Sequence, residues 1–308
     1  MNRLEAMSVL LLTVEKGTLT AAAKELHMPL PTVSRKISEL EAHLGAKLLQ
    51  RSTRKLTLTE AGRSYVDGVR RILEDVDEVE RRATGEYQVP RGELVLTAPV
   101  LFGQKYILPL VTDFLAQFPD INIRLLLSDR NLHLFDEDVD MAVRIGVLPN
   151  SRMRATRIGS MDTLTCATPE LLATHGKPKH PSDMERLPCV VFTAPTTATW
   201  LFRESVSRKE FGVDIRPRLS VTSAEAAIQA ALRHTGFTRV YRYHCAEHLR
   251  AGALVQVLRK FDVAPLPVHL IHGSQGQLPL KMRTFLDFAV PRLRDELALM
   301  STSNSSTK

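Results

Sequence analysis

Apolar positions recur at helical spacing in the first 45 residues of the chain. A helix over about residues 3–15 is predicted by four apolar side chains that share one face: Leu4, Met7, Leu11 and Val14. A second helix is predicted in TLTAAAKELHM, residues 18–28, with Thr20 as its N-cap. Its small inward residues, Ala22 and Ala23, allow a close crossing with the next helix.

A third helix is predicted to begin near Pro31 and to end at Gly45. Its buried face is marked by apolar residues that follow one another at steps of four, three and four: Val33, Ile37, Leu40 and Leu44. The opposite face carries Pro31, Arg35 and Ser38. This outward face is polar and basic, and it is therefore the face that can meet a partner.

A basic strand–turn–strand segment, KLLQRSTRKLTLTEAG at 47–62, follows the third helix. Its first part holds four cations and no acid: Lys47, Arg51, Arg54 and Lys55. Two helices joined by a short turn and followed by such a hairpin make a winged helix-turn-helix, which we expect over residues 1–59. The second helix of the pair enters the DNA major groove, where an arginine can donate two hydrogen bonds to a guanine, and the hairpin cations neutralise phosphates. A helix pair that contacts a protein is the alternative.

Residues 60–86 are predicted to form one long polar helix with a narrow apolar seam. The seam steps by four and three residues in an a/d heptad pattern: Tyr65, Val69, Ile72, Val76, Val79 and Ala83. A seam of this kind pairs with a second copy of the same helix, so we expect dimerisation through Tyr65, Val69, Ile72, Val76 and Val79. The alternative is a helix that lies on its own domain.

Strand candidates alternate with helices from residue 93 onward. The strands are predicted over 93–99, 121–127, 140–146, 162–168, 188–193, 215–221, 253–258 and 267–273, with helices at 223–234 and 279–297 among them. This alternation predicts an α/β fold with largely parallel sheets. Residues 88–92, QVPRG, are predicted to be a hinge, and residues 301–308 a disordered tail.

Charge and composition refine this picture only locally. The net charge of the chain is +7, but residues 1–88 hold 14 basic and 13 acidic residues, so the case for DNA depends on the hairpin cluster. No apolar run approaches the ~18 residues that a membrane span needs. We expect no signal peptide, and three scattered cysteines (Cys166, Cys189 and Cys245) suit reduced thiols. The expectation is a cytoplasmic protein without a membrane partner.

Motifs for catalysis and metal binding do not support an enzyme. The chain lacks G-x-S-x-G, H-E-x-x-H and G-x-G-x-x-G. His244, Cys245 and His248 could hold a metal from one helix, although such a trio more often lies on the surface. We expect no catalytic residue, no metal and no cofactor. A metabolite enzyme and a solute-binding protein of a transporter stay open as alternatives for the α/β part.

The chain resembles the LysR-type transcriptional regulators over about residues 1–300. The resemblance lies mainly in TAAAKEL and PTVSRKISELEAHLGAKLLQRSTRKLTLTEAG, and further in TAPVLFG, LSDR, DMAVRIG, SAEAAIQAAL and GFTRV. It implies a dimerisation helix at 60–87, followed by two Rossmann-like α/β subdomains with an effector cleft, as in periplasmic binding proteins. Subdomain I is expected at 93–161 and 267–300, and subdomain II at 162–266. The implied partners are promoter DNA, a small-molecule effector, further copies of the chain in a homodimer or homotetramer, and RNA polymerase.

The resemblance also assigns roles to single residues. Contacts to DNA are expected from Thr32, Ser34, Arg35, Ser38, Arg51, Arg54 and Lys55. The effector cleft is expected to be lined by Pro99, Val100, Leu101, Phe102, Ile145, Gly146, Thr222, Ser223, Phe237 and Thr238. This layout suits the rule that open α/β sheets bind ligands beyond the carboxyl ends of their strands. For each cleft residue, plain packing is the alternative role.

Two departures from the family pattern bear on specificity. Pro29 and Leu30 stand where the family commonly has a helix-capping serine and a base-reading glutamine. The preferred operator should therefore differ, because Leu30 can make only apolar contact, for example with a thymine methyl. Residues 222–224 are TSA, where the family often shows Asn-Asp. The lost carboxylate favours an anionic effector at the helix that begins near Ser223.

Overall fold

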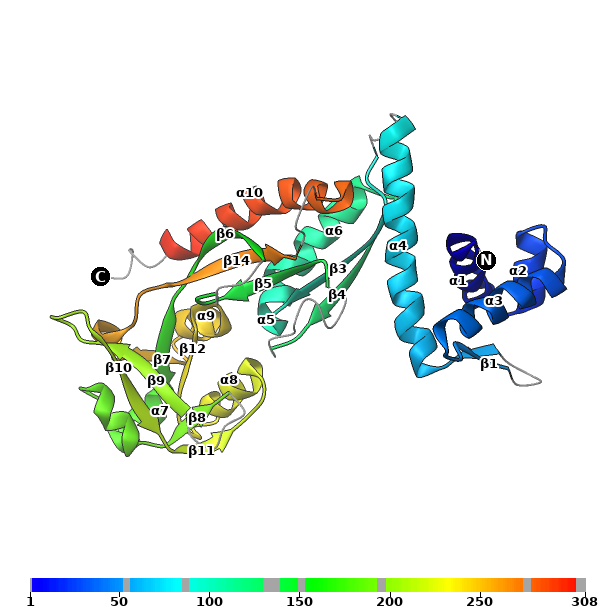
Figure 1. Ribbon diagram of the computed structural model, residues 1–308. Helices are drawn as coiled ribbons and strands as arrows, with labels where there is room; N and C mark the ends of the chain where they lie inside the picture. Colours follow the sequence, from blue (N-terminus) through cyan, green and yellow to red (C-terminus); the bar gives the residue numbers. More distant parts are fainter. Residues whose placement is uncertain are drawn as a thin grey trace. The chain divides into compact units, whose positions relative to one another are not determined.

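The structure of the 308-residue chain is a computed structural model that describes residues 2–51, 56–84, 89–129, 139–148, 153–192, 198–273 and 278–302. The chain divides into two compact units, Met1–Gly92 and Glu93–Lys308, each built around cores of its own. Figure 1 labels most of the helices and strands of both units.

The N-terminal unit consists of three short helices, a hairpin and one long helix (Figure 1). Its elements are α1 (Arg3–Lys16), α2 (Leu19–Glu25), α3 (Leu30–Leu44), β1 (Leu49–Arg51), β2 (Leu56–Leu58) and α4 (Glu60–Thr84). The two strands pair antiparallel, with Leu49 opposite Leu58. The winged helix-turn-helix predicted from the sequence is confirmed.

The core of this unit lies where α1 packs against α2, α3 and α4. Its buried side chains include Val9, Leu10, Val33, Ile37, Leu40 and Leu48. The predicted inner face of α1 is wrong by about one position: Leu4 is 43% exposed, whereas Ala6, Val9, Leu10 and Thr13 are buried. Because α1 meets three other helices, its buried surface is wider than a single stripe and is centred elsewhere.

The ends of these helices follow their capping residues. Thr18 caps α2, not Thr20 as predicted, and its hydroxyl accepts a hydrogen bond from the N–H of Ala21 at 3.1 Å. Gly45 ends α3 with φ of 65°, a left-handed conformation that suits glycine. Leu44, in the last turn of α3, is 38% exposed and does not belong to the buried stripe.

The apolar seam on α4 divides into two parts. Val69 is buried within the N-terminal unit, and Tyr65 packs against the core of that unit. Ile72 and Val79 are instead 46% and 64% exposed, and Val76 is half-buried. The first part of the seam therefore lies on its own domain, and only the second part leaves apolar side chains open to a partner.

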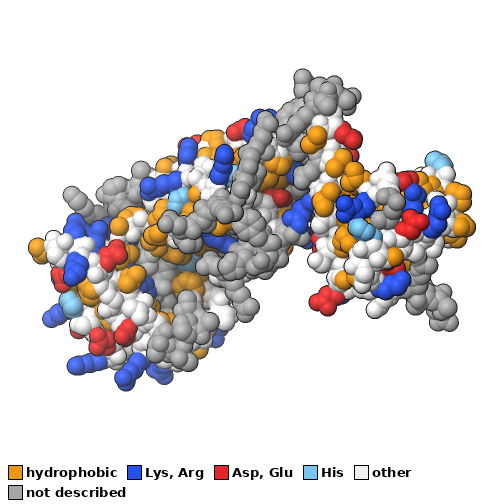
Figure 2. Space-filling view, in the orientation of Figure 1, with side chains coloured by type: hydrophobic (Ala, Val, Ile, Leu, Met, Phe, Trp, Pro, Cys, Tyr) orange, Lys and Arg blue, Asp and Glu red, His pale blue; other side chains and the backbone are white. Residues whose placement is uncertain are grey.

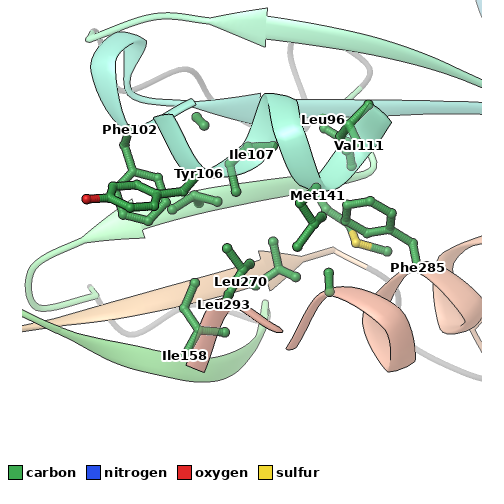
Figure 3. Close-up of a cluster of buried hydrophobic side chains, with 14 of the residues drawn as sticks. Leu96, Phe102, Tyr106, Ile107, Val111, Met141, Ile158, Leu270, Phe285 and Leu293 are labelled. Carbon is green, nitrogen blue, oxygen red and sulfur yellow. The ribbon is translucent and has the colours of Figure 1, made fainter. Parts of the chain in front are cut away.

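The first lobe of the C-terminal unit is built on a five-stranded sheet in the order β4-β3-β5-β14-β6. The strands are β3 (Gly92–Ala98), β4 (Ile121–Leu127), β5 (Met141–Ile145), β6 (Arg154–Met161) and β14 (Leu266–His272). One face is covered by α5 (Val100–Phe102), a π-helical turn (Gly103–Ile107), α6 (Leu108–Gln117) and α10 (Leu280–Thr302). Figure 3 shows the core between this face and the helices, where Met141 of the sheet lies beside Phe285 of α10, and Leu270 of the sheet lies near Leu293 of α10.

The second lobe contains a five-stranded sheet in the order β11-β8-β12-β7-β13. The strands are β7 (Thr163–Ala167), β8 (Cys189–Val191), β11 (Pro217–Ser220), β12 (Phe237–Tyr241) and β13 (Val255–Val257). One face packs against α8 (Ala224–Leu232) and α9 (Arg242–Arg250). The other packs against α7 (Pro169–His175), two 3-10 turns (Pro181–Glu185 and Arg259–Phe261) and a hairpin of β9 (Ala198–Arg203) and β10 (Glu210–Ile215).

The α/β fold is confirmed, but the sheets are mixed and not largely parallel. Strands β12 and β11 run parallel to β8, and β3 runs parallel to β5. Strands β14 and β7 are antiparallel to their neighbours in the sheets. The cause is the chain path: β6 ends in the first sheet at Met161, β7 begins in the second at Thr163, and the chain returns as β14. Strands β6, β9, β10 and β12 were not among the strands predicted from the alternation.

Within the described residues, no single helix is both long and apolar enough to cross a bilayer. Only α1 and α2 taken together, with a bend of 117° between them, meet those two criteria.

Candidate DNA-binding surface and effector pocket

The outward face of α3 presents its polar residues much as the sequence predicts. The side chain of Arg35 is 70% exposed, and its ion partner among the described residues, Glu39, lies 3.9 Å away on the next turn. Ser38 is also exposed, whereas Thr32 and Ser34 are half-buried. Val33 and Ile37 anchor the other side of the helix in the core with no exposed surface. The face is therefore rigidly held and open to a partner.

The first turn of α3 has no side-chain cap. Pro29 occupies the N-cap position, and Pro31 lies in the first turn, where its missing N–H costs nothing. Leu30 is the first residue of the helix and its side chain is 42% exposed. An apolar side chain thus lies at the N-terminal end of α3, which is the end that would enter the DNA major groove.

Glu41 connects α3 to the hairpin. Its carboxylate accepts hydrogen bonds from the backbone N–H groups of Leu48 (2.9 Å) and Leu49 (3.1 Å) and from Nζ of Lys47 (2.7 Å). Burial raises the pKa of Glu41, but these hydrogen bonds outweigh burial and hold the pKa below its usual value. A charged, buried carboxylate therefore fixes where the hairpin begins relative to the recognition face.

The predicted hairpin contacts fall largely outside what the structure describes. Arg51 ends β1, although its side chain is not among the described ones, and Arg54 and Lys55 lie outside the described residues. On the face seen in Figure 2, basic and acidic side chains are interspersed over the described part of the N-terminal unit. The predicted phosphate contacts of the hairpin stay a prediction.

The cleft residues predicted in the first lobe gather at one edge of its sheet. Because β3 and β5 run parallel, Pro99 and Val100 at the end of β3 lie beside Ile145 and Gly146 at the end of β5. Pro99, Val100, Leu101, Ile145 and Gly146 are half-buried. Phe102 is a correction: its side chain is wholly buried in the core, with its ring 5.6 Å from the ring of Tyr243 on α9.

The cleft residues predicted in the second lobe lie at two opposite ends of its sheet. Ser223 caps α8 by accepting a hydrogen bond from the N–H of Ala226, and Thr222 beside it is exposed. Phe237 and Thr238 instead begin β12, next to Cys189 at the start of parallel β8, and both are wholly buried. These two assignments are wrong, because the ligand edge of the sheet is where β8 and β12 end, not where they begin.

A cavity of about 590 Å³ lies in the second lobe at that ligand edge, between β9, the start of β7 and the ends of β8 and β12. Its lining residues are Thr163, Val191, Phe192, Ala198, Thr199, Trp200, Leu201, Glu210, Arg239, Val240, Tyr241, Val263 and Leu266. None of the ten predicted cleft residues is among them. The cavity is mainly apolar, which is typical of small-molecule sites.

Arg239 is the main charged group of this cavity that sequence reasoning missed. Its side chain is 5% exposed, donates to Oγ1 of Thr165 (2.9 Å) and to the carbonyl oxygen of Leu201 (2.7 Å), and lies 4.3 Å from the ring centre of Phe202. Asp262 is 3.6 Å away. A signal was present in the sequence, because an arginine inside the apolar strand FTRVY calls for a buried partner.

The histidine–cysteine trio of α9 does not form a metal site. His244 packs among Tyr241, Tyr243 and Phe192, and burial lowers its pKa to about 3. Cys245 is buried in the core beneath α8 and α9. In the described part of the chain, no group of three or more His, Cys, Asp or Glu residues could hold a metal ion.

Two family models match the chain. Residues 4–63 match the bacterial regulatory helix-turn-helix protein of the lysR family, and residues 87–294 match the LysR substrate binding domain. The chain belongs to the LysR family of transcriptional regulators. A LysR-type regulator has a helix-turn-helix that binds DNA and a C-terminal domain that binds an effector, and both are present here.

Individual relatives that match most of this LysR-type regulator are also described as transcriptional regulators. An HTH-type transcriptional regulator of Xanthomonas campestris pv. campestris is 32% identical over 286 residues, which cover 91% of this chain and 82% of the relative. An HTH-type transcriptional repressor of Pseudomonas aeruginosa is 30% identical, over 94% of this chain and 92% of the relative. The comparisons give no support to a solute-binding protein or a metabolite enzyme.

Solved structures of LysR-type regulators are similar over nearly the whole chain. CrgA from Neisseria meningitidis is 28% identical, with a TM-score of 0.59 over 94% of this chain and 98% of CrgA. The full-length virulence activator AphB of Vibrio cholerae is 26% identical, also with a TM-score of 0.59 and the same two coverages.

Proposed function

We propose that this LysR-type regulator reads promoter DNA with the exposed face of α3, pairs with a second copy through α4, and responds to a small anionic effector bound by its C-terminal unit. The observation that carries the proposal is the division of α3 into two faces. Val33 and Ile37 are wholly buried, whereas Arg35 is 70% exposed. A recognition helix needs both, because one face docks on the domain and the other enters the major groove.

The finer assignments are part of the same proposal. Thr32, Ser34, Arg35 and Ser38 contact bases or the backbone near them, and Arg51, Arg54 and Lys55 contact phosphates. The regulator acts in the cytoplasm as a homodimer or homotetramer, contacts RNA polymerase, and has no catalytic residue. These roles are supported by family membership and by the exposed face of α3.

A gel-shift titration with the DNA upstream of its own gene tests the proposed function. We expect the full chain to retard this DNA at moderate salt in the presence of excess unrelated competitor, since specific sites are typically at least ~10³-fold tighter than non-specific ones. Unlabelled upstream DNA should compete for the protein far better than DNA of random sequence. If both competitors remove the shift equally, the protein does not bind this DNA sequence-specifically.

Leu30 should make the protein bind more tightly to a site that carries a thymine methyl group at the contacted position. Its side chain is 42% exposed at the start of α3. Replacing the contacted thymine with deoxyuridine should weaken wild-type binding by about 0.8 kcal/mol, the value of one buried methylene-sized group. Fluorescence anisotropy with single deoxyuridine substitutions checks this. The Leu30→Ala variant should bind both DNAs equally, so an undiminished preference for thymine in that variant would rule out the contact.

Ile72→Glu should separate the copies of the regulator. Ile72 and Val79 form the exposed half of the α4 seam. A carboxylate placed between two such seams would lose its hydrating water without gaining a hydrogen-bond partner. We expect multi-angle light scattering to show a shift towards monomer at micromolar concentration. Ser64→Glu is the matched control, because Ser64 is exposed on α4 outside the seam. A stable dimer in the Ile72→Glu variant would refute pairing through α4.

A further inference from the structure

The guanidinium of Arg239 has unused hydrogen-bonding capacity inside the cavity of the second lobe. An arginine carries five N–H donors. Two of them donate to Thr165 and Leu201, and among the described residues no further hydrogen bond to this side chain is present. Asp262 is an ion partner at 3.6 Å, which is longer than a hydrogen bond. A side chain that is 95% buried therefore keeps free donors in a cavity that it lines.

The carboxylate of Asp262 also lacks part of its hydrogen bonding. One carboxylate oxygen, Oδ2, accepts a hydrogen bond from the side-chain amide of Gln256 at 2.7 Å. The other, Oδ1, is buried and has no hydrogen-bond partner within the described ranges. A buried acceptor without a donor is costly. The Arg239–Asp262 pair is thus incompletely hydrogen-bonded, and Arg239 is the member of the pair that lines the cavity.

The rest of the cavity fits an apolar body. Phe192, Trp200, Tyr241, Val263 and Leu266 supply aromatic and branched surface. The volume of about 590 Å³ lies in the range of ~300–1,000 Å³ that is usual for small-molecule sites. Glu210 is the acid among the lining residues, and it is exposed on β10.

We propose that this cavity binds a monocarboxylate with an aromatic or bulky apolar body, that the carboxylate pairs with Arg239, and that this acid is the effector. The last part rests on the proposed function. The cavity is placed to act on the lobes, because Thr163 follows the connection from β6, Val263 lies in the connection back to β14, and Leu266 begins β14. A ligand there touches both segments that join the two lobes.

Binding of the acid is coupled to a proton at Asp262. Burial raises the pKa of Asp262 to about 6, although Arg239 on β12 and Arg242 on α9 oppose that rise, while Asp162 between the lobes adds to it. A second carboxylate beside Arg239 raises this pKa further by like-charge repulsion. Asp262 therefore takes up a proton from solvent, and its hydroxyl can donate to the ligand. Affinity rises as the pH falls towards 6, while the acid itself stays ionised.

Isothermal titration of the full chain with 2-naphthoate and its neutral amide, 2-naphthamide, tests the proposal at pH 7.5 and pH 6.0. We expect the acid to bind at least about tenfold more tightly than the amide, and roughly tenfold more tightly at pH 6.0 than at pH 7.5. The Asp262→Asn variant should bind the acid at pH 7.5 as tightly as wild type does at pH 6.0, with little pH dependence. Arg239→Gln combined with Asp262→Asn, which leaves no unpaired buried charge, should bind acid and amide alike.

A matched control sharpens the outcome. Arg218→Gln removes an exposed arginine of the same lobe and should keep the preference for the acid and its pH dependence. Equal affinity for acid and amide in wild type, or an acid preference that survives the double substitution, would overturn the pocket. A chain that binds the acid without any specific DNA shift would instead overturn the proposed function, so the two failures are distinguishable.

Discussion

Replacing Arg35 with alanine is expected to weaken binding to the specific site by about 1–3 kcal/mol and to relax the choice of base at one position. Its side chain is the long donor on the exposed face of α3, and its only ion pair with described residues is a 3.9 Å contact to Glu39 on the surface. Such an exposed pair is weak, so the guanidinium is free to turn to a guanine. Competition titrations with single-base variants of the site measure both effects.

Arg54→Ala is the contrasting variant. A phosphate contact carries no base information, so this change should weaken binding to all DNA about equally and reduce the slope of log K against log salt by about 1. If Arg35→Ala produces that same uniform loss and keeps base discrimination intact, the recognition face has been misassigned.

Replacing Glu41 with alanine should destabilise the N-terminal unit by about 2–4 kcal/mol, because two buried backbone N–H groups lose their acceptor at once. Those groups belong to Leu48 and Leu49, and the side chain of Glu41 is 5% exposed. Glu41→Gln keeps one acceptor oxygen and should cost about 1–2 kcal/mol. Glu39→Ala is the matched control on the exposed side of the same helix, and it should change the free energy of unfolding by less than about 0.5 kcal/mol.

The contribution of Glu41 should also depend on pH in a defined direction. Its hydrogen bonds hold its pKa in the folded state below the ordinary value of 4.5. The stabilisation is therefore complete above about pH 4.5 and is lost as the pH falls through the lower folded-state value. Denaturant unfolding between about pH 3 and pH 6 should show a smaller loss of stability for Glu41→Gln than for wild type. Parallel curves for the two proteins would show that the charge on Glu41 adds nothing.

The recognition helix could be predicted from sequence because its pattern has one simple cause. Val33, Ile37 and Leu40 face a single core, so helical spacing gives the buried stripe directly. On α1 the same method chose the wrong centre, because three helices surround it and apolar residues appear on most of its surface. On α4 the heptad spacing alone does not tell that Val69 is buried while Ile72 is exposed.

The cavity of the second lobe could not be predicted from the sequence. The rule that ligands bind at the carboxyl ends of strands considers each strand by itself, and it pointed to Val100 and Ile145, which follow or end the parallel strands β3 and β5. It was misapplied to Phe237, which lies at the amino end of β12. The hairpin of β9 and β10 was not predicted at all, so Trp200 could not be placed over the sheet. Arg239 and Asp262 are 23 positions apart, and only the folded chain brings them together.

The central claim is that the exposed face of α3 lies in the major groove, and 7-deazaguanine substitution tests it most directly. Removing N7 from the guanine that Arg35 contacts deletes one major-groove acceptor without changing the base pairing. We predict that one such substitution weakens the binding of wild type by about 1 kcal/mol or more and has no effect on Arg35→Ala, so that the two losses are not additive. Equal losses in wild type and Arg35→Ala at every guanine of the site would contradict the claim, because they would show that this arginine does not read the groove.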